Sequence, residues 1–475
     1  MQSATIAAME RLTGLDAGFL YMETPTQHMH TLKIAILDPS TVPSGYRFDR
    51  VKEVLAERLH LLPPFRRRLV DVPFNLHHPV WIEDPDFDLD YHVRRVAVPA
   101  PGGQEELDEL ISQIASHQLD RRHPLWEVWV VEGLEHDHIG FVSKIHHCMA
   151  DGVKAAELLV NVFDTGPDAP TPAPPARPWQ PEVIPSGRHL LGQAIVAMMR
   201  ALLGVPALVR RTLQGFRAVA RRRRSGAVSP PLPFSAPTTT FNTALTPHRW
   251  YVSTSVSLDD VKAVKSALGA TVNDIVLATC AGALRRYFEA RRELPDRPLI
   301  AGVPVSTRTE EKGRLANSVS NLFASVPIHL ADPVARVTAI HEVMKGAKEQ
   351  LNLLGAEMLA DWSELTPPRP YAALNRAYSR FRLAERHRPP INLVISNVPG
   401  PTQPLYVAGA KLLSIYSMGP ILENIGLNIT VWSYLGQMNF GIVACRETMP
   451  DLRTLVGHLH DALAELKKAA DSATP

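Results

Sequence analysis

The chain has 475 residues, of which 45% are apolar and 21% are charged, and its 50 basic residues nearly balance its 48 acidic residues. These values are typical of a globular protein with two or three domains, and they exclude disordered, collagen-like and coiled-coil chains. The net charge of +2 gives no overall attraction to nucleic acid, and three widely spaced cysteines exclude a disulfide framework and favour a reducing compartment.

The first half of the chain alternates predicted helices and strands. Apolar residues at helical spacing predict helices over 48–61 and 104–118, and short apolar runs predict strands over 126–131 and 138–147. A further helix is expected over 152–163. This half, residues 1–165, is therefore predicted to be an N-terminal α/β domain.

Residues 166–240 are predicted to be a linker, because prolines crowd both of its ends. Eight prolines fall between residues 167 and 185, and four more fall between 230 and 237. Ten arginines and no acidic residue lie between residues 183 and 250. The rest of the chain has 40 basic against 48 acidic residues, so the linker is a strongly basic segment in an otherwise mildly acidic chain.

Inside this linker, apolar residues recur at steps of three and four, which predicts an amphipathic helix broken in two by Gly204 and Pro206. Such a basic helix can lie in a membrane interface, where arginines meet anionic headgroups. The alternatives are a helix that packs on the protein's own core with solvated arginines, and an RNA-binding segment, which few aromatic residues support. No run of 18 uncharged apolar residues occurs, so no transmembrane helix is expected. The stripe consists of Leu191, Ile195, Met198, Leu202, Val205, Val209, Leu213 and Phe216.

The second half, residues 241–475, is again predicted to mix strands and helices. Helices are expected over 272–291, over 333–354 with Asp332 as the N-cap, and over 450–468. The two halves have similar character, which suggests an internal structural duplication, although no sequence repeat is visible. The expected strands cover 250–256, 299–305, 319–328, 392–396, 412–416, 426–432 and 438–444.

The residues with chemical potential concentrate where the strand over 138–147 ends. His146 and His147 are adjacent, so the alternation of a strand should point them to opposite faces, with His147 on the face of Ile139, Phe141 and Ile145. An imidazole titrates near neutrality, so His147 could take a proton from a hydroxyl or thiol and return it. Asp151 could orient a histidine or pair with an arginine, and Gly152 permits a tight strand-to-helix turn. The catalytic candidates are therefore His146, His147, Asp151 and Gly152.

Two other interpretations of the histidine pair stay open. Most histidines near a core are structural, and a histidine pair followed by an aspartate could bind a metal. Adjacent strand residues point apart, so they are poor ligands for one metal ion, and we expect no metal site. No GxSxG, P-loop or dinucleotide-binding glycine pattern occurs, which argues against serine hydrolases, nucleotide hydrolases and Rossmann enzymes.

Several motifs together resemble a known family. The string His146 to Gly152 (HHCMADG) resembles the HHxxxDG motif of the coenzyme-A-dependent acyltransferase superfamily, which includes chloramphenicol acetyltransferase and peptide-synthetase condensation domains. The ordered set of motifs resembles more narrowly the bacterial wax ester synthase/diacylglycerol acyltransferases of actinobacterial type. These motifs are LTGLDAGFLYMETPTQHMH near the N-terminus, PLWEVWVVEGL from Pro124, TVNDIVLA from Thr271 and SNVPGP from Ser396.

The resemblance implies an α/β fold of two chloramphenicol-acetyltransferase-like halves, with mixed sheets flanked by helices and an active-site tunnel at their interface. It implies transfer of a long-chain acyl group from acyl-coenzyme A to diacylglycerol or to a long-chain alcohol. His147 would be the general base on the acceptor hydroxyl, without a covalent acyl-enzyme. Acyl-coenzyme A would be a co-substrate, and no cofactor is expected.

The resemblance also assigns candidate residues outside the histidine motif. Asp151 would be structural in the superfamily and salt-bridged to an arginine, for which Arg308 is our candidate. The substrate-binding candidates are Pro124, Leu125 and Trp126, which would shape the acyl channel, Asn273 and Asp274, which could also cap a helix, and Ser396 and Asn397.

The expected partners are acyl-coenzyme A, the lipid acceptor and a lipid surface bound by the Arg-rich linker, with no nucleic acid. The expected location is cytoplasmic, on the inner face of the membrane or on lipid droplets. Two alternatives keep part of this picture: a catalytically weak lipid-binding protein, and an acyltransferase that takes its acyl group from a carrier-protein thioester.

Overall fold

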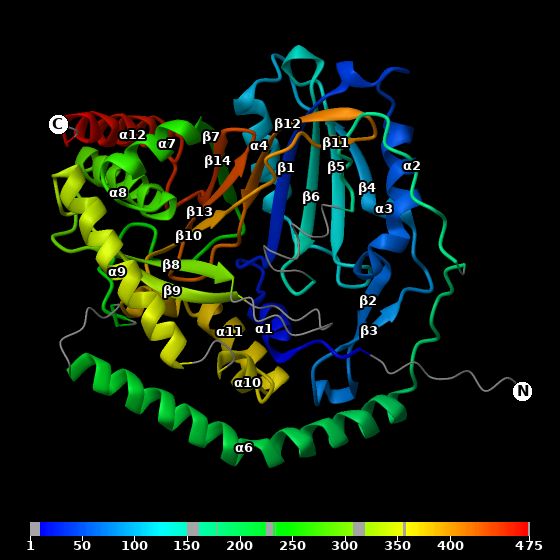
Figure 1. Ribbon diagram of the computed structural model, residues 1–475. Helices are drawn as coiled ribbons and strands as arrows, with labels where there is room; N and C mark the ends of the chain where they lie inside the picture. Colours follow the sequence, from blue (N-terminus) through cyan, green and yellow to red (C-terminus); the bar gives the residue numbers. More distant parts are fainter. Residues whose placement is uncertain are drawn as a thin grey trace, which may run out of the picture.

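The computed structural model describes residues 10–149, 161–176, 178–224, 231–232, 234–306, 319–354 and 358–473. Two six-stranded sheets form the centres of the two halves of the molecule (Figure 1). Each sheet contains parallel and antiparallel neighbours, and helices flank both sheets. The predicted α/β class with mixed sheets is therefore confirmed.

The first sheet carries the histidine strand at its centre. Its strand order is β11-β12-β1-β6-β5-β4, in which only β4 and β5 pair in parallel. Helix α2 (Phe48–Arg58) packs its apolar side on one face, and helix α4 (Gln104–Ala115) packs on the other. The strands are β1 (His30–Asp38), β4 (Val93–Ala97), β5 (Trp126–Glu132), β6 (Ile139–His146), β11 (Tyr406–Val407) and β12 (Ala410–Met418).

Two strands of this first sheet come from the second half of the chain. β12 pairs with β1 along seven residue pairs, and β11 continues the sheet beyond β12. β12 also contacts two strands of the second sheet, β13 (Leu427–Tyr434) and β14 (Gln437–Cys445). The two halves are therefore interlocked by a strand exchange that the division into 1–165 and 241–475 does not anticipate.

The second sheet has the order β7-β14-β13-β10-β8-β9, with β10 parallel to both β8 and β13. Helices α8 (Val272–Ala290), α9 (Pro333–Leu354) and α12 (Thr454–Ala473) pack together beside it and share its apolar core. The remaining strands are β7 (Arg249–Ser257), β8 (Leu299–Ser306), β9 (Val319–Val326) and β10 (Leu393–Val398).

Smaller elements complete the described chain. Helix α1 lies next to α10 and α11, and β2 and β3 form a separate two-stranded sheet. These elements are α1 (Gly14–Met22), β2 (Arg67–Val70), β3 (Val80–Glu83), α3 (Leu89–His92), α7 (Leu258–Ala267), α10 (Met358–Ser363), α11 (Pro368–Arg380) and short 3-10 turns at Pro39–Thr41, Leu59–Leu61, Pro63–Arg66, Pro73–Asn75, Glu135–Asp137 and Leu383–Arg386.

Most predicted elements agree with the structure to within a few residues. Helix α9 has the predicted bounds, and the Asp332 carboxylate accepts the Ala335 N–H at 2.8 Å, as expected of an N-cap. The helix expected over 152–163 lies mostly outside the described residues, and its last three positions, 161–163, are not helical. Helix α12 begins four residues later than predicted, because residues 450–453 form turns.

Two helices were predicted in the linker, but its described residues form a single helix, α6 (Gly187–Arg224). The helix continues through Gly204 and Pro206 and curves along one edge of the molecule, beneath both halves (Figure 1). A proline removes one backbone hydrogen bond and bends a helix, but the turns on either side can continue. The prediction of a break at Pro206 was therefore wrong.

The predicted apolar stripe of α6 mostly points away from the protein. Ile195, Leu202, Leu213 and Phe216 are each about half exposed, whereas the side that faces the body buries Leu190, Ala194 and Leu208. Residues 187–222 of α6 are long and apolar enough to cross a membrane, with 11% of the most apolar window buried. The search for 18 consecutive uncharged apolar residues in the sequence missed this part of α6, because Arg200 interrupts the run.

Candidate active site at the end of the histidine strand

The backbone of the two motif histidines is held by the starts of both neighbouring strands. The His146 N–H donates to the Leu125 carbonyl at 2.9 Å, just before β5 begins. The His147 N–H donates to the Met29 carbonyl at 2.7 Å, just before β1 begins. Both peptide units at the end of β6 therefore have a defined position between two strands.

The two imidazoles lie on opposite sides of the sheet, as the strand alternation predicts. His146 is fully buried on the α4 side, where the neighbouring Lys144 donates to carbonyls of α4 and the turn after it. His147 is half-buried, and its ring stacks on Phe19 of α1 with centroids 4.0 Å apart. His147 thus lies between the sheet and α1, on the face opposite to His146.

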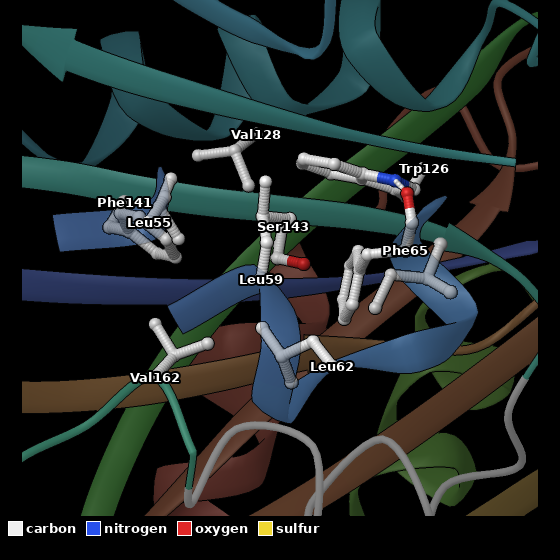
Figure 2. A pocket seen from close by; sticks show the side chains of 10 residues that line it. Leu55, Leu59, Leu62, Phe65, Trp126, Val128, Phe141, Ser143 and Val162 are labelled. Carbon is white, nitrogen blue, oxygen red and sulfur yellow. Dashed lines mark hydrogen bonds between the residues drawn. The ribbon is translucent and has the colours of Figure 1, made fainter. Parts of the chain in front are cut away.

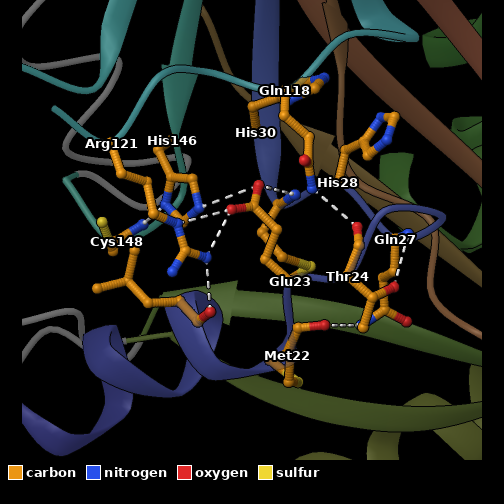
Figure 3. A network of polar contacts seen from close by, with 12 residues as sticks. Met22, Glu23, Thr24, Gln27, His28, His30, Gln118, Arg121, His146 and Cys148 are labelled. Carbon is orange, nitrogen blue, oxygen red and sulfur yellow. Dashed lines mark hydrogen bonds and ion pairs between the residues drawn. The ribbon is translucent and has the colours of Figure 1, made fainter. Parts of the chain in front are cut away.

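A buried carboxylate, Glu23, connects His146 to an arginine (Figure 3). Glu23 caps the end of α1, and its side chain is 4% exposed. Its Oε1 lies 3.6 Å from Nε2 of His146, and its Oε2 accepts two hydrogen bonds from Arg121, at 2.6 and 3.0 Å. Arg121 also donates to the Leu20 carbonyl at 2.7 Å. The network joins α1, β6 and the loop before β5.

The contacts in this network indicate the charge of the Glu23 carboxylate and the position of the proton on a neutral His146 ring. Burial raises the pKa of Glu23, but His146 and Arg121 outweigh that effect and lower the pKa to about 2. The Cys148 N–H donates to Nδ1 of His146 at 3.2 Å, so Nδ1 is an acceptor and a neutral His146 carries its proton on Nε2, towards Glu23. Glu23 is therefore an ionised carboxylate that orients the His146 ring.

Sequence reasoning did not single out Glu23. It lies in the N-terminal motif, but no local pattern shows that it meets a histidine more than a hundred residues later. The local signal is a single acidic residue between an apolar helix and a strand, and such residues are common on protein surfaces.

The Pro-Leu-Trp segment lies beside the histidine strand. Trp126 pairs with Ile145 across β5 and β6, and its indole N–H donates to the Phe65 carbonyl at 2.7 Å. Trp126 lines a narrow apolar cavity of about 20 Å³ between the first sheet and α2 (Figure 2). Leu125 and Pro124 are buried at the start of β5 and do not line this cavity. The other lining residues are Leu55, Leu59, Leu62, Phe65, Val128, Phe141, Ser143, Ile145 and Val162.

This cavity lies on the face of β6 that leads to His147. Phe141, Ser143 and Ile145 line it at alternate positions, and His147 is the next residue in that series. Two residues of a strand advance by about 6.7 Å, so the Cα of Ile145, whose side chain lines the cavity, lies about that far from the Cα of His147.

The C-terminal motif approaches the same apolar cluster from the second half. Ser396 and Asn397 are half-buried near the end of β10, and the next residue, Val398, packs against the cluster that contains Ile145 and Trp432. Gly400 is required there, because a Cβ at this position would lie 2.1 Å from the Ser433 carbonyl oxygen. The structure thus brings this motif towards the histidine strand.

Asn273 and Asp274 lie at the start of α8, on the second sheet. Asp274 forms a capping box with Thr271, in which the Thr271 N–H donates to Asp274 Oδ2 at 2.9 Å. Asp274 also accepts from Nδ1 of His341 at 2.8 Å. No hydrogen bond or ion pair between described residues joins Asn273 or Asp274 to the histidine strand. Asp274 therefore caps helix α8, which is the other role that the sequence allowed for this residue.

The remaining candidates fall outside the described residues. Asp151, Gly152 and Arg308 belong to this group, so the predicted Asp151–Arg308 pair stays a prediction. Within the described part of the chain, no group of three His, Cys, Asp or Glu side chains could hold a metal ion. His28 and His30 both contact the Ala115 carbonyl, at 3.2 and 3.0 Å, and are buried packing residues.

Comparison with known proteins identifies relatives over almost the whole chain. Residues 12–276 match the wax ester synthase/diacylglycerol acyltransferase catalytic domain, and residues 315–467 match the C-terminal domain of the same family. Two relatives from Mycobacterium tuberculosis H37Rv, described provisionally as the diacylglycerol O-acyltransferases Rv1760 and Rv0221, are each 40% identical. The matches cover 98% of this chain and 91% of Rv1760, and 97% of this chain and 97% of Rv0221.

Solved structures give the same result for the fold. The wax ester synthase/diacylglycerol acyltransferase from Marinobacter aquaeolei VT8 superposes with a TM-score of 0.69 at 30% identity, covering 98% of this chain and 100% of that one. The first condensation domain of the calcium-dependent antibiotic synthetase superposes with a TM-score of 0.58 at 14% identity, covering 98% of this chain and 97% of that one. The second match supports the fold alone.

Proposed function

The chain belongs to the wax ester synthase/diacylglycerol acyltransferase family, and on that premise we propose that it transfers a fatty acyl group from acyl-coenzyme A to the hydroxyl of diacylglycerol or of a long-chain alcohol. The expected family is confirmed, and the protein is an acyltransferase. The observation that carries the proposal is the position of the two motif histidines, His146 and His147, at the end of a central strand beside the Pro-Leu-Trp segment.

His147 is the general base of this reaction. Its imidazole takes the proton of the acceptor hydroxyl as the hydroxyl oxygen attacks the thioester carbon. The new carbon–oxygen bond forms, the carbon–sulfur bond breaks, and His147 returns the proton to the departing thiolate of coenzyme A. A general base of this kind contributes about 10²- to 10⁴-fold. The position of the half-buried His147 ring, stacked on Phe19 at the end of β6, supports this role.

The end of the acyl chain lies in the cavity beside Trp126. The cavity is lined by apolar side chains and one serine, and it lies on the sheet face that leads to His147. Its present volume is about that of one water molecule. Side chains such as Leu59 and Leu62, on the turns that cover it, would have to move to admit a longer alkyl segment.

The acyl donor is a co-substrate, so this mechanism needs no resident cofactor. Direct attack on a thioester requires a base, a positioned hydroxyl and a leaving thiolate, and these come from His147 and the two substrates. A carrier-protein thioester would satisfy the same chemistry, so the donor is one of the outcomes of the experiment below.

The protein works on a lipid surface in the cytoplasm, which it contacts through α6. Seven apolar side chains of α6 are about half exposed or more, so this surface is not covered by the protein's own core. Arginines accompany it, and a basic amphipathic helix binds an interface that carries anionic lipids. The inner face of the membrane and lipid droplets both offer such a surface. The seven side chains are Ile195, Val196, Met199, Leu202, Leu203, Leu213 and Phe216.

The activity is tested by thiol release from palmitoyl-coenzyme A by the purified protein, with hexadecanol or dioleoylglycerol as acceptor and with the lipid products resolved. Acceptor-dependent release that disappears in His147→Ala is the expected result, and the better acceptor names the main product. Equal background release from both proteins with both acceptors would contradict a coenzyme A donor. The surface contact is tested by sedimentation with anionic vesicles, which should decrease when Arg221 to Arg224 are replaced by glutamine.

A further inference from the structure

A groove with a volume of about 620 Å³ lies between the first half of α6 and the beginning of the described chain. Its walls carry three arginines: Arg11 from the body, and Arg188 and Arg200 from α6. None of the lining residues that the structure describes is acidic, and Val196 and Ala197 give the groove an apolar side. The groove lies outside the histidine site, and the proposed transfer reaction does not use it.

The three guanidinium groups have no carboxylate partner. Within the described residues, no Asp or Glu oxygen lies within 4.0 Å of Arg11, Arg188 or Arg200. Other arginines of the same helix differ, because Arg211 pairs with Asp361 at 2.9 Å and Arg222 pairs with Glu349. The cations of the groove are therefore available to an anionic ligand.

Arg11 is the fixed member of this group. Its guanidinium donates to the His78 carbonyl at 2.5 Å, and burial lowers its pKa below the usual value, so this cation is partly desolvated. Tyr21 and then Glu364 partly oppose this lowering of the Arg11 pKa, and Glu364 already accepts the Gly14 N–H at 2.6 Å. An anion in the groove would compensate a charge that the protein leaves only partly balanced.

The start of α6 adds to the attraction for an anion. Arg188 is the second residue of this 38-residue helix, whose start carries a positive dipole, and Ser186 accepts the N–H groups of His189 and Leu190 at 3.4 and 3.1 Å. The helix start and the arginine cluster therefore favour the same charge, and phosphate oxygens suit planar guanidinium groups.

One exposed apolar side chain lines the groove and another lies in a turn that contacts the start of α6, and both suit an amphiphile better than a free phosphate. Val196 lines the groove and is 49% exposed. The turn Pro73–Asn75 contacts the start of α6, where the Pro73 ring lies 3.2 Å from the position of a Cβ on Gly187. Phe74 in that turn is 70% exposed and has a φ of 61°, a conformation that L residues rarely adopt.

We propose that this groove binds the phosphate of a phospholipid headgroup, with Arg11, Arg188 and Arg200 on the phosphate oxygens and with Phe74 and Val196 in contact with the lipid's hydrocarbon edge. The proposal rests on the proposed lipid-surface role of α6 and refines it, because it adds one defined phosphate site to the basic surface of the helix. It also orients the protein, since the headgroup fixes the start of α6 at the interface.

The test is calorimetric binding of dihexanoylphosphatidylglycerol, at concentrations below its micelle threshold, to the full-length protein. We expect saturable binding of one molecule to the wild type. The variant Arg11→Gln/Arg188→Gln/Arg200→Gln should bind about 100-fold more weakly, at about 1 kcal/mol per arginine and 1.4 kcal/mol per factor of ten. The double variant Arg188→Gln/Arg200→Gln, which changes only exposed residues, should lose about 30-fold by the same conversion.

The matched control removes the same charge from the same helix but outside the groove. Arg210 and Arg217 are exposed and unpaired among the described residues, so Arg210→Gln/Arg217→Gln, the counterpart of Arg188→Gln/Arg200→Gln, should bind the lipid as the wild type does. An equal loss in the control and groove variants, or no saturable binding to the wild type, would overturn the defined site in favour of diffuse electrostatics.

Two further arms distinguish the source of the phosphate. Inorganic phosphate, which lacks acyl chains, should bind at least about tenfold more weakly than the lipid. Coenzyme A should not compete with dihexanoylphosphatidylglycerol for the groove. Competition by coenzyme A would overturn the lipid assignment and make the groove part of the donor site. Thiol release from detergent-dispersed substrates should be the same in wild type, control and groove variants. If neither the wild type nor any variant shows turnover, that result would instead count against the proposed acyltransferase function.

Discussion

Glu23 and His146 face each other at the end of the first sheet, with Oε1 of Glu23 3.6 Å from Nε2 of His146 and both side chains almost fully buried. Because Arg121 holds the other oxygen of Glu23, the carboxylate cannot turn away without leaving an arginine unpaired. The pair positions the peptide from which His147 projects to the opposite face. Glu23 is therefore a positioning residue for a base that it does not touch.

Replacement of Glu23 by glutamine should lower kcat by about 10- to 100-fold, because a small displacement of His147 misplaces the base relative to both substrates. The KM for acyl-coenzyme A should change little, since the Glu23 side chain faces His146 and does not line the apolar cavity. Steady-state kinetics check both values, and Glu23→Asp, which keeps the charge, should recover part of kcat. Wild-type kcat in Glu23→Gln, or a change confined to KM, would contradict the positioning role.

The same carboxylate should contribute to acid stability. Its pKa is about 2 in the folded protein and near 4.5 when unfolded, so its contribution to the free energy of unfolding is fully present above pH 4.5 and is lost as the pH falls towards 2. The difference in unfolding free energy between wild type and Glu23→Gln should therefore shrink over this range. Denaturant titrations between pH 6 and pH 2 test the trend, and a constant difference would show that folding does not lower the pKa of this carboxylate.

The substitution His147→Ala should reduce kcat by about 10²- to 10⁴-fold while the protein stays folded. The matched control is His123→Ala, because His123 stacks on Tyr91 at 3.9 Å much as His147 stacks on Phe19 at 4.0 Å. Both variants should lose a comparable stacking energy, on the order of 0.5–1.5 kcal/mol. Only His147→Ala should lose turnover, and equal activities of the two variants would remove His147 from the mechanism.

Local patterns in the sequence were sufficient for most of the regular elements. The alternation in β6 predicted that His146 and His147 point apart, and helical periodicity predicted α8 and α9 closely. These features depend on neighbours within a few residues, which is the range over which propensity and periodicity act.

Features that depend on distant contacts could not be predicted in the same way. β12 joins the first sheet through β1, almost four hundred residues earlier, and the Glu23–Arg121 pair joins residues 98 positions apart. No local pattern specifies such partners. In α6 the periodicity left open whether the apolar stripe packs on the body or meets a lipid surface, and the structure shows that most of the stripe faces outwards, whereas a second set, Leu190, Ala194 and Leu208, packs on the body.

The width of the cavity beside Trp126 should set the preferred length of the acyl chain. The substitution Leu59→Ala enlarges the cavity, so the ratio of kcat/KM for stearoyl- over myristoyl-coenzyme A should rise several-fold, at about 0.8 kcal/mol per newly buried CH₂ group. Leu61→Ala is the matched control, because Leu61 lies in the same turn, is 38% exposed and does not line the cavity. An unchanged chain-length profile in Leu59→Ala would exclude the cavity as the acyl site.

A buried lysine at the junction of the two halves should make the protein less stable as the pH falls. Nζ of Lys33 on β1 donates to Oγ of Ser417 at 2.7 Å and lies 4.0 Å from the ring centroid of Trp432, with no carboxylate within 4.0 Å among the described residues. Burial lowers its pKa from 10.5 to about 7, so the unfolded chain binds more protons between pH 7 and 10.5 and the stability of the fold rises with pH over that window. Below pH 7 the full cost of a buried ammonium applies.

Lys33→Met should therefore raise the free energy of unfolding by a few kcal/mol at pH 6, since one pKa unit is worth about 1.4 kcal/mol, and the gain should fall as the pH rises towards 10. Denaturant titrations at several pH values measure this gain, and Lys262→Met, at an exposed position on α7, should show none. A pH-independent effect of Lys33→Met would mean that the lysine pKa is not lowered in the fold.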